Sequence, residues 1–135
     1  MISLSNKILE EIAGHGRQDA PNEACGYILG KEGRAYEIIR MENADKSPEH
    51  FSFRPQEQFA ALKTARSKGL GLIAVYHTHP SSPARMSRED IRLANDPQII
   101  YVIYSLIENR LKCFRVSPGK TVTEEKLEVC TNERI

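Results

Sequence analysis

A run of apolar residues that ends in two histidines constrains the fold of this chain more than any other feature. Residues 72–76 predict a buried strand, and His77 and His79 follow directly. Side chains two residues apart in a strand point to the same face of a sheet, so we expect the two imidazoles to project together. Pro80 has no amide to give to a ladder, and the strand should end there. The fold must therefore present a pair of imidazoles at the end of a buried strand.

The segment after Pro80 adds further ligand types. Ser87 and Asp90 open a predicted helix with the pattern Ser-x-x-Asp. Together, His77, His79 and Asp90 would offer zinc three ligands and leave the fourth position open, as in catalytic zinc sites. Each feature also has a structural alternative, because a histidine pair can be solvated and Ser-x-x-Asp is close to a capping box. Their combination at this short spacing favours a metal site.

The composition excludes several classes of protein. The chain has 135 residues, 40% hydrophobic and 27% charged, which predicts one domain over residues 1–135. A net charge of +1 gives no reason to expect nucleic acid or an anionic membrane as a partner. Three cysteines without C-x-x-C spacing argue against a disulfide framework, and neither a secretory signal nor a membrane span is visible. We therefore expect a cytoplasmic protein, whose oligomeric state the sequence leaves open.

Apolar residues at positions 4, 8 and 12 predict an amphipathic helix near the N-terminus. Ser3 or Ser5 can cap its start, and Gly14 or Gly16 is expected to end it. His15 falls in the last turn, where a cation suits the helix dipole, so we expect it on the surface.

Strands and two further helices are expected along the rest of the chain. A helix should begin at Pro55 and end at Gly69, and a second should run from Ser87 to just before Pro97. Strands are expected at residues 24–29, 34–41, 51–53, 70–77, 99–104 and 111–116, and residues 121–129 are expected to follow as a further strand or as a tail. The order α-β-β-β-α-β-α-β-β-β indicates a single α/β domain with a mixed sheet flanked by helices.

Amide hydrolysis at a zinc site also needs a base for the attacking water and a donor for the oxyanion. Ser87 can be the donor. Glu89 is about 100° around the helix from Asp90 and need not face the metal. Glu23 is the better base, since it stands where a loop enters a strand among small residues. Its structural alternative is an exposed loop carboxylate.

Two other residues near the site have plain structural readings. Cys25 shares a strand face with Glu23 and is expected to be a small buried hydrophobe. A rival hypothesis makes Cys25 the nucleophile of a thiol hydrolase, with His77 or His79 as its base. Arg85 is expected to be a solvated loop cation, the alternative being a contact with the substrate.

The spacing of these residues resembles a known family motif. Glu23, then His77-Thr78-His79-Pro80, then six residues and Ser87-Arg88-Glu89-Asp90 is similar to the full motif of the JAMM (MPN+) metalloproteases, Glu…His-x-His-Pro-x6-Ser-x-x-Asp. Residues 22–30 and 53–71 also resemble the small bacterial members, so the similarity covers nearly the whole chain. Met86 stands where many bacterial relatives have proline, a difference that should alter loop stiffness more than chemistry.

The resemblance implies a curved mixed sheet flanked by helices, zinc held by His77, His79 and Asp90, Glu23 as general acid/base and Ser87 steadying the oxyanion. It further implies cleavage at the C-terminal end of a ubiquitin-like sulfur-carrier protein, either releasing cysteine or trimming the carrier. The chain has no room for the insertions with which eukaryotic deubiquitinating relatives grip ubiquitin. The alternatives are a general deubiquitinase-like isopeptidase and a non-catalytic MPN scaffold, although such scaffolds lack the His-His-Asp set.

Overall fold

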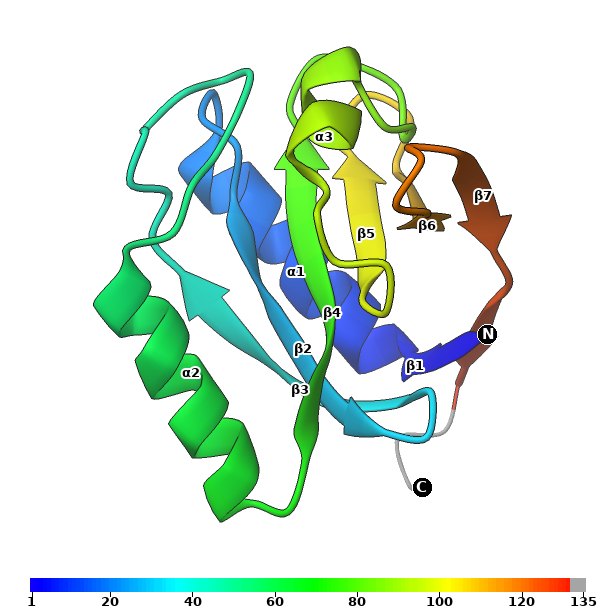
Figure 1. Ribbon diagram of the computed structural model, residues 1–135. Helices are drawn as coiled ribbons and strands as arrows, with labels where there is room; N and C mark the ends of the chain where they lie inside the picture. The colour runs from blue at the N-terminus through cyan, green and yellow to red at the C-terminus, as the bar shows by residue number, and fades with distance from the viewer. Residues whose placement is uncertain (132–135) are drawn as a thin grey trace.

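The strand that carries the histidines is β4 (Gly71–His79), which lies near the middle of a mixed eight-stranded sheet (Figure 1). The structure is a computed structural model that describes residues 1–131. β4 pairs antiparallel with β2 (Cys25–Lys31) and parallel with β5 (Ile100–Ser105). Every residue of β5 except Tyr101 is buried, as expected for a central strand covered on both faces.

The sheet continues on both sides of these three strands. Beyond β5 lie β6 (Arg110–Val116) and β7 (Val122–Glu125), both paired antiparallel. Beyond β2 lies its predicted hairpin partner β3 (Arg34–Met41). β1 (Ile2–Ser5) then pairs parallel with β3 and with β8 (Leu127–Cys130), so β8 forms the edge opposite β7.

The two edges of the sheet approach each other. β7 and β8 are consecutive in the chain and separated by Lys126 alone. The amino group of Met1, just before β1, forms an ion pair with Glu125 of β7. The sheet is therefore curved and nearly closed, which confirms the predicted α/β fold class with a mixed, curved sheet.

Helices cover both faces of the sheet (Figure 1). α1 (Asn6–Asp19) packs its apolar side against Ala74 and Tyr76 of β4. α2 (Pro55–Ser67) packs on the opposite face, in a cluster that includes Val75. No helix among residues 1–131 has the length and apolar character needed to cross a membrane.

The helix starts follow the chemistry of their first residues. The Ser5 hydroxyl accepts a hydrogen bond from the Ile8 amide at 3.2 Å, which makes Ser5 the cap of α1. Pro55 occupies the first turn of α2. The third helix, α3 (Arg88–Leu93), begins with a capping box formed by Ser87 and Asp90.

The prediction that Gly14 or Gly16 ends the first helix is wrong, because α1 continues to Asp19. A Cβ atom on Gly16 would lie 2.8 Å from Cγ2 of Thr78, so this glycine lets the helix approach β4 closely and does not stop it. The expected surface position of His15 is also wrong. Its side chain is buried, and Nδ1 forms a 2.8 Å hydrogen bond with the Tyr76 hydroxyl.

Several other boundaries differ from the sequence prediction. Residues 2–5 form β1, which was not expected, because the apolar pattern there was assigned to the helix. Residues 51–53 form a loop in place of a strand, with the rings of Phe51 and Phe53 5.4 Å apart. β4 extends through His79, and α3 ends at Leu93, well before Pro97. Residues 121–129 contain β7 and most of β8 rather than one strand.

Candidate metal centre

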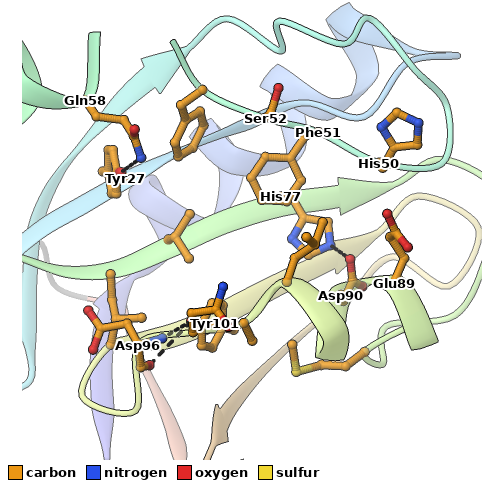
Figure 2. Close-up of a pocket in the computed structure, with 17 residues that line it drawn as sticks. Tyr27, His50, Phe51, Ser52, Gln58, His77, Glu89, Asp90, Asp96 and Tyr101 are labelled. Atoms are coloured by element: carbon orange, nitrogen blue, oxygen red, sulfur yellow. Dashed lines mark hydrogen bonds and ion pairs between the residues drawn. The ribbon is translucent and has the colours of Figure 1, made fainter. Parts of the chain in front are cut away.

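The predicted ligand residues meet where β4 ends and α3 begins. The Nε2 atoms of His77 and His79 lie 3.2 Å apart. Asp90 places Oδ1 3.2 Å from Nε2 of His77 and Oδ2 3.0 Å from Nε2 of His79. All three side chains are buried, and Figure 2 shows His77 and Asp90 side by side. Two residues of β4 and one residue of α3 thus direct their side chains at one small volume.

Strand pairing brings the predicted base to the same place. Cys25 of β2 lies opposite His77 in the ladder, so Glu23, two residues earlier, approaches His79. Ligand atoms of Glu23, His77 and His79 all lie within 4.8 Å of one another. The exposed loop carboxylate that was the alternative for Glu23 is wrong, because only 3% of this residue is exposed.

The hydrogen bonds of His79 fix which of its nitrogens can bind a cation. Nδ1 lies 2.8 Å from the carbonyl oxygen of Pro83, which can only accept, so Nδ1 carries a proton. In the neutral imidazole, Nε2 then holds a lone pair directed at Asp90 and His77. Lone pairs and a carboxylate facing one another at about 3 Å repel unless a proton or a metal cation lies between them, so a metal can replace the protons of this cluster. The donor set of two imidazoles and a carboxylate fits zinc.

Ionisation of the cluster follows from its contacts. Burial opposes ionisation of Asp90, but hydrogen bonds with His77 and His79 outweigh it and hold the pKa of Asp90 well below its ordinary value. For His79, burial lowers the pKa, whereas the hydrogen bonds with Asp90 and Pro83 raise it, and the net direction is upward. The cluster therefore contains an ionised carboxylate that attracts positive charge.

Glu23 differs from Asp90 although both are buried. Burial raises the pKa of Glu23 to about 8; His79 opposes this rise, and the negative charges of Asp90 and Glu49 add to it. Its Oε1 atom has no hydrogen-bond partner among the described residues. Leaving a buried carboxylate oxygen unpaired costs free energy, which is typical of functional sites. A carboxyl group with a pKa near neutrality can both take and give a proton.

Ser87 combines two roles in its hydrogen bonds. Its Oγ accepts from the Asp90 amide at 3.0 Å, and its own amide donates to Asp90 Oδ2 at 3.0 Å. The capping box that was the structural alternative is thus present, and it also orients the Asp90 carboxylate. The bonds among residues 1–131 leave the hydroxyl hydrogen of Ser87 available to another acceptor.

An apolar cavity of about 540 Å³ opens beside His77 and Asp90 (Figure 2). Tyr27, Val75 and Tyr101 lie side by side on neighbouring strands and line it. Phe51 lines the same cavity, and its ring centroid lies 4.8 Å from that of His77. Nothing in the sequence marks these aromatic residues as part of a cavity, because they are indistinguishable there from core residues.

Three other residues named from the sequence, Cys25, Arg85 and Glu89, lie outside the cluster of imidazoles and carboxylates. Cys25 is fully buried as expected, and burial raises the pKa of its thiol to about 12. A thiol with so high a pKa is a poor nucleophile, which argues against the thiol-hydrolase hypothesis. Arg85 is exposed, as expected for a loop cation. Glu89 lines the cavity and pairs with Arg92 at 2.8 Å, while Asp90 faces the histidines.

Comparison with known proteins gives the family. Residues 5–117 match the model of prokaryotic homologs of the JAB domain. The chain belongs to this prokaryotic JAB family. The JAMM (MPN+) resemblance is thereby confirmed. A solution structure of a protein from Desulfitobacterium hafniense is 40% identical in sequence and superposes with a TM-score of 0.89. The superposition covers 98% of this chain and 94% of that one.

Two curated JAB-type relatives carry functional names. The CysO-cysteine peptidase of Mycobacterium tuberculosis is 32% identical over 127 residues, which cover 90% of this chain and 86% of the relative. A probable TtuB-protein conjugate cleaving protease of Thermus thermophilus is 32% identical over 116 residues, which cover 85% and 76%. Both names describe peptide or conjugate hydrolysis.

Proposed function

We propose that residues 1–135 form a zinc-dependent hydrolase that cleaves at the C-terminal end of a ubiquitin-like sulfur-carrier protein. The observation that carries this proposal is the buried cluster at the end of β4, where two imidazoles meet the Asp90 carboxylate while Glu23 keeps an unpartnered oxygen. The names of the relatives, a CysO-cysteine peptidase and a TtuB-protein conjugate cleaving protease, support the substrate class.

In this proposal His77, His79 and Asp90 hold the zinc. Bound zinc would polarise the substrate carbonyl and lower the pKa of water. The chain contributes the fixed geometry, because His79 is held by the Pro83 carbonyl and Asp90 by the Ser87 amide. These outer bonds keep the ligand atoms directed at one point.

Glu23 and Ser87 supply the proton and hydrogen-bond chemistry. Glu23 takes the proton of the attacking water on its unpartnered Oε1 and passes it to the leaving nitrogen. In the metal-free protein, burial raises the pKa of Glu23 to about 8, and a nearby cation would lower it toward neutral pH, where the carboxyl group can both take and give a proton. The hydroxyl of Ser87 donates to the carbonyl oxygen as negative charge develops on it.

The apolar cavity beside the cluster would hold the extended tail of the carrier. Its floor of Tyr27, Val75 and Tyr101 excludes water and offers apolar surface to a peptide. The tail's last residues would have to be small to reach His77 past Phe51.

A second candidate changes only the leaving group. In an isopeptidase, the bond would join the carrier to a lysine of another protein, and the name of the Thermus relative favours it. The scaffold alternative has less support, because a module that only binds partners has no need of the His77, His79 and Asp90 set.

The test is hydrolysis of two substrates: a sulfur carrier with a C-terminal cysteine adduct, and the same carrier linked to a lysine side chain. Products are identified by mass spectrometry for wild type, for Glu23→Gln, and for a control, Glu10→Gln, on the exposed side of α1. We expect wild type and the control to release cysteine, Glu23→Gln to lose about 100-fold or more in rate, and zinc to restore chelated wild type. Equal rates for Glu23→Gln and wild type would refute the mechanism, and cleavage of the lysine conjugate alone would favour the isopeptidase.

A further inference from the structure

The main chain of Glu23 is held by a loop and not by a neighbouring strand. Glu23 precedes the first residue of β2, Cys25, so it lies outside the ladder. Its amide donates a 2.9 Å hydrogen bond to the carbonyl oxygen of Ser47. Its own carbonyl accepts a 3.1 Å hydrogen bond from the side chain of Asn43. Both partners belong to the loop of residues 42–54, between β3 and α2, which we call the β3–α2 loop.

The side chain of Asn43 anchors this loop by hydrogen bonds to backbone groups. It is 6% exposed, and its Nδ2 donates to the carbonyl oxygens of Glu23 and of His50, the latter at 3.0 Å. Its Oδ1 accepts from the Asp45 amide at 3.0 Å. One buried amide therefore ties the start of β2 to both ends of the loop. Both polar atoms of this side chain are thus bonded within the protein.

The direction of the Glu23 carboxylate depends on this anchorage. Oε1 has no hydrogen-bond partner among residues 1–131, so side-chain contacts do not fix where that oxygen points. On the C-terminal side, the Ala24 amide is held by the Thr78 hydroxyl at 2.9 Å. The Asn43 bond holds the carbonyl of Glu23, which is the other polar end of the same peptide plane. Without it this plane would be held through the Ala24 amide alone, and the backbone of Glu23 would be less firmly fixed.

Asn43 contacts none of the three ligand residues of the cluster. His79 is held by Pro83, Asp90 by Ser87, and His77 lies within the β4 ladder opposite Cys25. The hydrogen bonds that hold Glu23 are thus separate from those that hold the three ligand residues, although Phe51 of the same loop packs against the ring of His77. A change at Asn43 should therefore displace Glu23 more than the ligand residues.

We propose that Asn43 is a positioning residue for the hydrolysis, which holds the backbone of Glu23 so that its carboxylate points at the cluster. This inference rests on the proposed role of Glu23 as the proton carrier. Asn43 does not touch the reacting atoms. It acts through the two main-chain bonds of Glu23, one direct and one by holding the loop that contains Ser47.

The test is a double-mutant cycle between Asn43→Ala and Glu23→Gln, with kcat, KM and zinc affinity measured for each protein. A misplaced catalytic group costs about 100-fold, so we expect kcat of Asn43→Ala to fall by about that factor while KM stays within about 2-fold. Zinc affinity should stay within about 3-fold of wild type by competition with a chromophoric chelator. In the Glu23→Gln background, Asn43→Ala should lower the residual kcat by less than about 3-fold.

Ser47→Ala is the matched control. It removes one side-chain bond from the same loop, the 3.0 Å bond between its hydroxyl and the Glu49 amide, and keeps the main-chain bond to Glu23. We expect its kcat to equal that of wild type within about 2-fold. An equal loss of kcat from Asn43→Ala in both backgrounds, or a parallel loss of zinc affinity, would overturn the proposal, because either result would mean a general loosening of the site.

Amide hydrogen exchange of the zinc-free proteins tests the anchorage without any activity. Asn43→Ala should speed exchange at the Glu23 amide, whose acceptor is in the loop, by about 10-fold and leave the His77 amide unchanged. Unchanged exchange at Glu23 would overturn the proposal. Should wild type cleave neither conjugate, the proposed function fails, and the exchange experiment still decides whether Asn43 holds Glu23.

Discussion

Replacing Glu23 with glutamine should stabilise the metal-free protein, and the gain should grow with pH. Glu23 is buried, its Oε1 is unpartnered, and its pKa is raised from the ordinary 4.5 to about 8. Between these values the folded protein keeps a proton that the unfolded chain loses, so stability falls as pH rises. Each pH unit in this interval costs about 1.4 kcal/mol, and wild type should lose about 3 kcal/mol between pH 4.5 and pH 7. Glutamine does not titrate and avoids this loss.

The measurement is urea denaturation followed by circular dichroism at pH 5, 6 and 7 in the presence of a chelator. The difference in unfolding free energy between Glu23→Gln and wild type should widen by about 2.5 kcal/mol from pH 5 to pH 7, equivalent to about 8 °C in Tm for a domain of this size. Glu10→Gln, an exposed carboxylate on α1, serves as control and should follow wild type at every pH. Parallel curves for Glu23→Gln and wild type would refute the reasoning, since they would mean that Glu23 is ionised at neutral pH in the folded protein.

Three further results are expected. Asp90→Asn should weaken zinc binding by at least about 100-fold in a chelator competition, because even outer-shell changes cost 10–100-fold; binding as tight as in wild type would exclude Asp90 as a ligand. Gly26→Ala should lower the free energy of unfolding by about 3 kcal/mol or more in thermal denaturation, because its Cβ would lie 2.3 Å from the Ile39 carbonyl oxygen. Gly14→Ala is the control: its Cβ would meet nothing within 4 Å, so the substitution should be neutral or stabilising. A chelator should abolish hydrolysis and a thiol alkylator should not, since Cys25 is fully buried; the opposite pattern would revive the thiol mechanism.

The sequence predicted best where a local rule and a tertiary contact agree. Strand parity alone places His77 and His79 on one face, and the structure has both in the same cluster. The Ser-x-x-Asp pattern predicts a helix start, and α3 begins there. Both rules depend on residues at most a few positions apart, so no knowledge of the rest of the chain is needed.

Errors arose where a distant segment decides the structure. Gly16 and His15 look like a helix end in isolation, but close contact with Thr78 and Tyr76 of β4 keeps the helix going and buries the histidine. Residues 2–5 form a strand because β3 on one side and β8 on the other, both distant in the sequence, supply its partners. Asn43 resembles any loop asparagine in the sequence. Only the fold shows that its amide reaches Glu23.

The pairing of β1 with β8 has a consequence for how the protein is made. Ile2 lies opposite Leu127, so β1 finds its outer neighbour only after all the strands between β1 and β8 have been synthesised. Until then the outer edge of β1 is an open row of amides and carbonyls, the kind of edge that recruits strands from other nascent chains. Closure of the sheet therefore waits for β8, and the time between the synthesis of β1 and that of β8 sets how long this edge stays exposed.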